Sequence, residues 1–138
     1  MHHEPELLKK LSGTHAPLFG GEYNSASSLF GSSKLRDGDD IPCTVCQSRR
    51  GVQKLMIPAR VTCSKGWTKQ YAGYLATTYY VHKASAEYIC MDQNPTASHG
   101  GHHNYNGALP YPVSAVCGAL PCPPYKSGDT ISCVVCTK

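Results

Sequence analysis

The residues of this 138-residue chain with the clearest potential for chemistry are its eight cysteines, four of which form two matching motifs. Cys43 and Cys46 make one C-x-x-C motif, and Cys133 and Cys136 make the other. Four thiolates in paired motifs can hold a structural zinc ion, one motif can act as a redox centre, and paired thiols can form disulfides. The spacing and surroundings of the motifs bear on which of these uses applies.

The arrangement favours disulfides over the other two uses. The motifs lie much farther apart than zinc ligands usually do, and four more cysteines separate them: Cys63, Cys90, Cys117 and Cys122. A thioredoxin-like centre needs a βαβ unit with a helix starting after the motif, and neither is visible. An even number of cysteines in a short chain with 16% charged residues indicates a disulfide framework formed in an oxidising compartment. We therefore expect a secreted, extracellular protein with all eight cysteines bridged.

Strand geometry bears on how the cysteines pair. Residues i and i+3 of a strand point to opposite faces, so a bridge within either motif is disfavoured if both motifs lie on strands. The alternative is that Cys43 and Cys46 pair with Cys133 and Cys136 across neighbouring strands, while the other four cysteines pair among themselves. Eight cysteines allow about 105 connectivities, so other pairings stay open.

Composition predicts the kind of fold that these bridges staple. The chain has 41% hydrophobic residues but only two Phe and one Trp, with 13 Gly and 10 Pro. Such a core is small, and cross-links are the usual remedy. We expect one all-β, disulfide-stapled domain over residues 41–138. Residues 1–40 would form an arm packed on or wrapping that core, with a short helix at residues 4–11, where acidic residues precede lysines.

The hydrophobic pattern places the strands. Residues 52–61 predict an edge or interrupted strand around Pro58, and residues 71–81 and 86–91 predict further strands. The β-branched residues 130–136 predict the final strand, and the polar residues 92–107 predict a long loop. The acidic stretch at residues 36–40 lacks an EF-hand pattern and predicts a turn.

Several function classes are not supported by the sequence. The net charge of +4 comes from scattered Lys and Arg rather than a patch, so no nucleic-acid partner is expected. No apolar run approaches the ~18 residues of a membrane span. No signal peptide is apparent at residues 1–5, so the disulfide interpretation predicts that a leader was removed or is not included in this sequence. No nucleophile elbow, zinc-protease motif or phosphate loop occurs, so we expect no enzyme.

Polar and aromatic residues provide the candidate binding sites. The cluster His99, His102 and His103 could hold a divalent metal, and no other cofactor is expected. Aromatic faces and hydrogen-bonding side chains together suit a sugar, whose ring has apolar C–H faces and polar hydroxyls. The candidate ligand-binding residues are Trp67, Tyr79, Tyr80, Asp92, Asn94, His99, Asn104, Tyr105 and Asn106.

Several segments also resemble a known family. Six segments are similar to the C-terminal globular region of sponge-type short-chain (spongin) collagens and related secreted invertebrate proteins: Met56–Arg60, Cys63–Thr68, Tyr71–Leu75, Tyr88–Asp92, Cys117–Tyr125 and Cys133–Cys136. The segment Cys63–Trp67 bears a more distant likeness to the non-collagenous domain of type IV collagen. The resemblance covers about residues 40–138. This chain departs from the family in having no collagen triplets.

The resemblance implies an extracellular, disulfide-bonded β domain that associates into homo-oligomers. Since the collagen rod is missing, we expect a soluble, non-enzymatic, lectin-like protein whose partners are glycans. Repetition of a weak site across subunits would supply avidity. The alternative is a structural module that assembles with extracellular-matrix components, with or without metal binding at the histidine loop.

Overall fold

The structure, a computed structural model, describes residues 18–24, 29–32, 34–43, 53–82 and 86–138. Within these ranges the regular elements are all β-strands, which confirms the predicted β-rich class. The strands are β1 (Lys54–Pro58), β2 (Thr68–Thr78), β3 (Ile89–Asp92), β4 (Pro110–Pro112) and β5 (Ser132–Thr137). The predicted helix at residues 4–11 lies outside the described residues.

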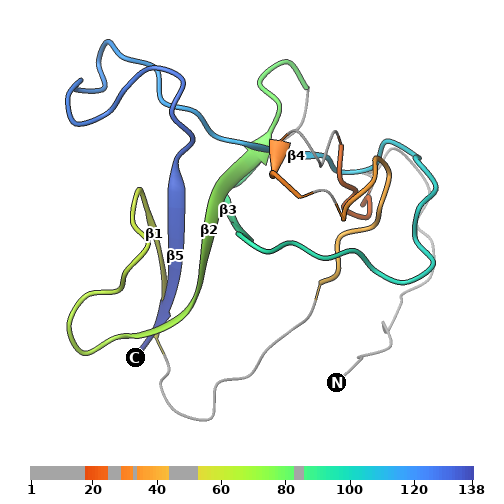
Figure 1. Cartoon of the computed structure of the whole chain (residues 1–138), viewed down its shortest axis with the longest axis horizontal. Helices are drawn as coiled ribbons and strands as arrows, with labels where there is room; N and C mark the ends of the chain where they lie inside the picture. The colour runs from red at the N-terminus through yellow and green to blue at the C-terminus, as the bar shows by residue number, and fades with distance from the viewer. Residues whose placement is uncertain (1–17, 25–28, 33, 44–52, 83–85) are drawn as a thin grey trace, which may run out of the picture.

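One antiparallel sheet organises the molecule (Figure 1). Its strand order is β1-β5-β2-β3, and β4 also pairs with β2. Ala76 of β2 pairs with both Ile89 of β3 and Pro112 of β4, so these two short strands lie on opposite edges of β2. β2 is therefore the central strand, and its last residues are flanked on both sides.

Of the two predicted alternatives for the strand around Pro58, the structure confirms the edge strand. β1 pairs only with β5, and Pro58 is its last residue, opposite Cys133. Proline cannot donate a backbone hydrogen bond, and a strand terminus at a sheet edge tolerates that loss. The predicted third strand is shorter than expected, because β3 begins at Ile89 rather than at residue 86.

Two apolar clusters pack on the same face of the sheet, towards opposite ends of β2. One contains Ala72, Val134 and Cys136, with Ile57, Cys63 and Trp67 packed against them. The other contains Tyr23, Phe30, Leu35, Ala76 and Met91. Because residues 72, 74 and 76 of a strand point to one face, Tyr74 joins the second cluster from that face. The sequence supplies few large side chains, and the core is correspondingly divided and small.

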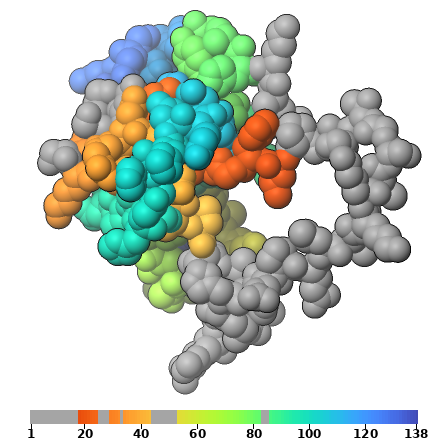
Figure 2. Space-filling view, turned by 90° about the vertical axis from the view of Figure 1, so that its right-hand side faces the viewer, coloured from red at the N-terminus to blue at the C-terminus, as the bar shows by residue number. Residues whose placement is uncertain are grey.

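Three side chains from the described residues between 18 and 41 contribute directly to this core. Tyr23, Phe30 and Leu35 are each at most 5% exposed, and all three lie in the second cluster. Backbone hydrogen bonds join the segment to the long loop, from Asp40 N to Gly101 O at 3.1 Å and from Ala108 N to Gly20 O at 2.8 Å. Figure 2 shows this red-to-orange segment lying against the teal-to-cyan loop. The described residues of this segment are thus packed against the sheet and the long loop.

Gly73 allows an unusually close approach between β2 and β3. A Cβ atom built on Gly73 would overlap the carbonyl oxygen of Met91 and would come within 2.7 Å of Gln93 N. Gly73 is buried, and it pairs with Asp92 on one side and with Cys133 on the other. Any larger residue would therefore push the backbone of β3 away from the central strand.

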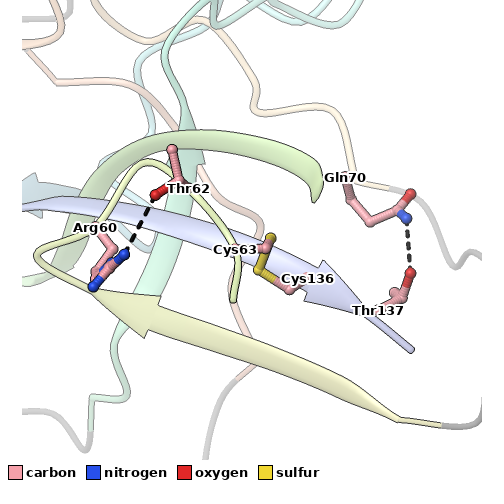
Figure 3. The surroundings of a disulfide bond; sticks show 6 residues. All are labelled: Arg60, Thr62, Cys63, Gln70, Cys136 and Thr137. Carbon is pink, nitrogen blue, oxygen red and sulfur yellow. Dashed lines mark hydrogen bonds between the residues drawn. A yellow bond between two sulfur atoms is a disulfide. The ribbon is translucent and has the colours of Figure 1, made fainter. Parts of the chain in front are cut away.

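The described residues contain three disulfides, two of which are anchored on β5, and their pairing differs from the predicted one. Cys133 is bridged to Cys90, Cys136 to Cys63, and Cys117 to Cys122. The expectation that Cys133 and Cys136 pair with Cys43 and Cys46 is therefore wrong. β1, which follows the first motif and pairs with β5, carries no cysteine, whereas β3 and the 59–67 segment each bring a cysteine to β5. Figure 3 shows the bridge from the 59–67 segment, between Cys63 and Cys136. Cys43 has a free, exposed thiol, and Cys46 lies outside the described residues.

Candidate functional site

Three tyrosines and a histidine gather at the end of β2, and we call this group the tyrosine cluster: Tyr79, Tyr80, His82 and Tyr111. The ring centroids of Tyr79 and Tyr80 lie 4.6 Å apart, and those of Tyr79 and Tyr111 lie 5.1 Å apart. His82 lies 5.5 Å from Tyr79 and 6.0 Å from Tyr111. Tyr79 is thus the central ring of the group.

Secondary structure explains why these rings meet. Tyr79 directly follows β2, and a turn closed by a 2.9 Å hydrogen bond from His82 N to Tyr79 O returns His82 to the group. Tyr111 lies on β4 opposite Thr77 of β2. Tyr79 comes two residues after Thr77, so its side chain projects to the same face of the sheet as Thr77 and Tyr111. In Figure 1 the green turn after β2 stands at the end of the sheet far from the C-terminus.

The cluster is exposed, but its rings are held in place. Tyr80 is 86% exposed, whereas Tyr111 is half-buried and accepts a 2.7 Å hydrogen bond from Asn24 Nδ2. A side-chain hydrogen bond with Tyr80 raises the pKa of Tyr79, with smaller contributions from the neighbouring phenols and from burial. The cluster therefore offers phenol hydroxyls and exposed aromatic faces, and the raised pKa keeps the phenol of Tyr79 protonated at neutral pH.

A second group of exposed rings lies on the histidine loop, residues 98–107. His102 and His103 stack with centroids 5.4 Å apart, and His103 lies 5.9 Å from Tyr105, which is 78% exposed. The loop is fastened beneath these rings, because Tyr105 N donates a 3.1 Å hydrogen bond to Oε2 of buried Glu22. Asn104 and Asn106 are also exposed.

The predicted metal ligands do not form a coordination site in this arrangement. Among the described residues, no three His, Cys, Asp or Glu side chains lie close enough together to hold a metal ion. His102 and His103 are stacked, and neither forms such a group with His99. A structural zinc or copper site needs several converging ligands. Metal binding at His99, His102 and His103 therefore stays a prediction without a formed site.

The remaining candidate residues lie elsewhere. Trp67 is half-buried in the cluster around Cys136, before the start of β2, so a strand of 11 residues, about 35 Å, separates it from Tyr79. Asp92 ends β3, where its Oδ1 accepts a 2.8 Å hydrogen bond from Asn94 N and so forms a local turn. The structure thus divides the predicted sugar site among separate surfaces.

Sequence reasoning missed Tyr111 and Asn24. Tyr111 reaches the cluster through pairing of the three-residue strand β4 with β2, and its two flanking prolines gave no strand signal. Asn24 reaches Tyr111 over 87 residues of sequence. No local pattern marks contacts at such separation.

The acidic stretch at residues 36–40 forms a turn, as predicted. Asp39 is buried, and its carboxylate accepts a 2.8 Å hydrogen bond from Arg36 N and lies 3.5 Å from Arg36 Nε. Gly38 has a positive φ of 81°, which suits glycine at this turn. The carboxylate of Asp39 is thus used within the turn.

Comparison with protein families, curated proteins and solved structures found no match to this chain. The likeness to short-chain collagens therefore stays a prediction from the sequence. No helix in the described ranges combines the length and apolar character needed to cross a membrane.

Proposed function

We propose that this chain is an extracellular, non-enzymatic protein that binds carbohydrate through the tyrosine cluster. The observation that carries the proposal is the exposed grouping of Tyr79, Tyr80 and Tyr111 with His82. Tyrosine presents an apolar face for sugar C–H groups and a hydroxyl for sugar oxygens, and it loses little conformational entropy on binding.

Pre-organisation supports this choice of surface. Tyr79 touches three neighbouring rings, and the hydroxyl of Tyr111 is held by Asn24. Rings fixed in this way cost less entropy when a ligand binds than freely rotating ones. The three disulfides support extracellular placement, because such bonds persist in oxidising compartments.

The histidine loop supplies a second recognition surface in this proposal. His103 and Tyr105 form an exposed ring pair flanked by the amides of Asn104 and Asn106. One small surface of this kind gives weak affinity, so homo-oligomers would bind multivalent glycans by avidity. A metal at the loop would make binding sensitive to EDTA.

A glycan array on the oxidised protein, run with and without EDTA, tests the proposal. We expect hits that survive EDTA and that Tyr80→Ala weakens, since Tyr80 projects from the tyrosine cluster. Tyr88→Ala is the matched control, because Tyr88 is 60% exposed and makes no ring contact in the described structure. Tyr105→Ala and Asn104→Ala report on the histidine loop. A silent array, or equal loss for Tyr80→Ala and Tyr88→Ala, contradicts the proposal.

A silent array would favour the other function, a matrix or assembly module. A specific feature supports this second candidate: Val81, Tyr88 and Ile89 are 57%, 60% and 44% exposed, respectively, and occupy the segments flanking the end of β2 and the start of β3. Exposed apolar side chains near a sheet edge suit association with another chain. Sedimentation of the purified protein over a concentration series would then measure self-association.

A further inference from the structure

A cavity of about 260 Å³ lies beside the end of β2, apart from the residues of the tyrosine cluster. Its apolar walls come from three segments that are distant in sequence, represented by Ile41, by Ile89, and by Leu109 with Pro110. Thr77 and Thr78 of β2 also line it. The volume lies between an engineered cavity of roughly 150 Å³ that binds benzene and the ~300 Å³ of the smallest ordinary ligand pockets.

Backbone hydrogen bonds hold the walls in position. Glu22 N donates to Ala108 O at 3.1 Å, and Ile41 N donates to Gly21 O at 2.9 Å, which joins two walls to one another. Pro110 pairs with Thr78, and Thr77 Oγ1 donates a 3.2 Å hydrogen bond to Glu87 O. The cavity is therefore a pre-formed feature of the sheet end, as ligand pockets usually are.

Among the described residues that line this cavity, one is charged. Glu87 is exposed, and within the described ranges its carboxylate forms no ion pair. None of the lining residues that the structure describes is a Lys, Arg or His. Within the described part of the chain, the lining thus combines a mostly apolar wall with a single negative charge and offers no cationic side chain to an anion.

From this combination we propose that the cavity binds a small molecule with an apolar body and a cationic amine. The body fills the space between Ile41, Ile89 and Leu109, and the ammonium group faces the carboxylate of Glu87. A benzene ring with a two-carbon arm is of suitable size, because the cavity exceeds the one that holds benzene alone. This site is independent of the sugar-binding proposal.

The test is a titration of the oxidised, isotope-labelled protein followed by the amide signals of Thr77, Thr78, Ile89 and Leu109. The probes are 2-phenylethylamine, the neutral 2-phenylethanol and the anionic 3-phenylpropionate, which share one apolar body. We expect millimolar binding for the amine, at about five-fold or more higher affinity than for the anion. The alcohol should lie between them.

Variants separate the apolar and charged parts of the site. Glu87→Gln should equalise the amine and the anion while leaving the affinity for the alcohol unchanged. Asp129→Asn is the matched control, since this exposed carboxylate lies outside the cavity lining, and it should keep the preference. Ala108→Phe should abolish binding of all three probes by filling the cavity. Amide shifts confined to other residues, or equal affinities in the unaltered protein, would overturn the proposal.

Discussion

Cys133 and Cys136 lie on opposite faces of β5, and each is bridged to a different part of the chain. Cys133 is joined to Cys90 on β3, with Cα atoms 5.7 Å apart, and Cys136 is joined to Cys63 in the segment after β1, with Cα atoms 6.0 Å apart. The last strand is thus covalently fixed from both faces. Hydrogen bonding adds to this at its end, where Gln70 Nε2 donates to Thr137 Oγ1 at 2.8 Å (Figure 3).

The three bridges should differ in their contribution to stability. The sequence separations are 73 residues for Cys63–Cys136, 43 for Cys90–Cys133 and 5 for Cys117–Cys122. Chain entropy then gives about 4 kcal/mol for each of the first two bridges and about 2 kcal/mol for the third. Denaturant unfolding of paired Cys→Ala variants measures these values.

Cys43→Ser is the control for that series. Its thiol is exposed and forms no bridge, so we expect a change in unfolding free energy within about 0.5 kcal/mol. A loss of several kcal/mol from Cys43→Ser would contradict the bridge pattern described here. So would a short bridge that proved as costly to remove as the long ones.

A second prediction concerns Gly73. Gly73→Ala should lower the unfolding free energy by about 2 kcal/mol or more, because the new methyl group overlaps the Met91 carbonyl in the adjacent backbone. Gly20→Ala is the matched control, because nothing lies within 4 Å of a Cβ at that position. Thermal unfolding of both variants tests the difference, and equal melting temperatures would show that β3 can shift at no cost.

The sequence predicted the sheet better than it predicted the contacts between distant segments. Alternation and β-branched residues located β1, β2 and β5, and Pro58 indicated an edge, because these signals act within a few residues. The bridge partners of Cys133 and Cys136 depend on strand order, which no local pattern encodes. The same is true of the burial of Tyr23 and Phe30 and of the contact between Asn24 and Tyr111, which are set by packing across the sheet.

A third prediction concerns alkaline stability. Burial raises the pKa of Tyr23, and the negative charges of Cys43, Asp92 and Asp39 add to it, while the phenol donates a 3.0 Å hydrogen bond to Thr96 O. Above about pH 10 the unfolded chain releases this proton more readily than the folded chain, so stability falls as pH rises. Below that pH, the contribution is fully present.

Tyr23→Phe should therefore flatten the loss of stability between about pH 9 and pH 11, although it removes a hydrogen bond worth about 1 kcal/mol at neutral pH. Tyr88→Phe, at an exposed position, is the control and should leave the slope as it is. Denaturant unfolding at several pH values gives the slopes. An unchanged slope for Tyr23→Phe would show that this phenol does not limit alkaline stability.

The last prediction separates the ring of Tyr111 from its hydroxyl. The ring lies 5.1 Å from that of Tyr79 and 6.0 Å from that of His82, whereas the hydroxyl meets Asn24. If the cluster binds sugar by its faces, Tyr111→Phe should keep most of the affinity, while Tyr111→Ala should lower it about two- to ten-fold, because Tyr79 loses a packing partner. Both variants should lose some unfolding free energy, so stability is measured alongside binding. If Tyr111→Phe and Tyr111→Ala lower the affinity equally, the hydroxyl held by Asn24 is the part of Tyr111 that matters for recognition. If neither lowers it, Tyr111 does not take part in recognition.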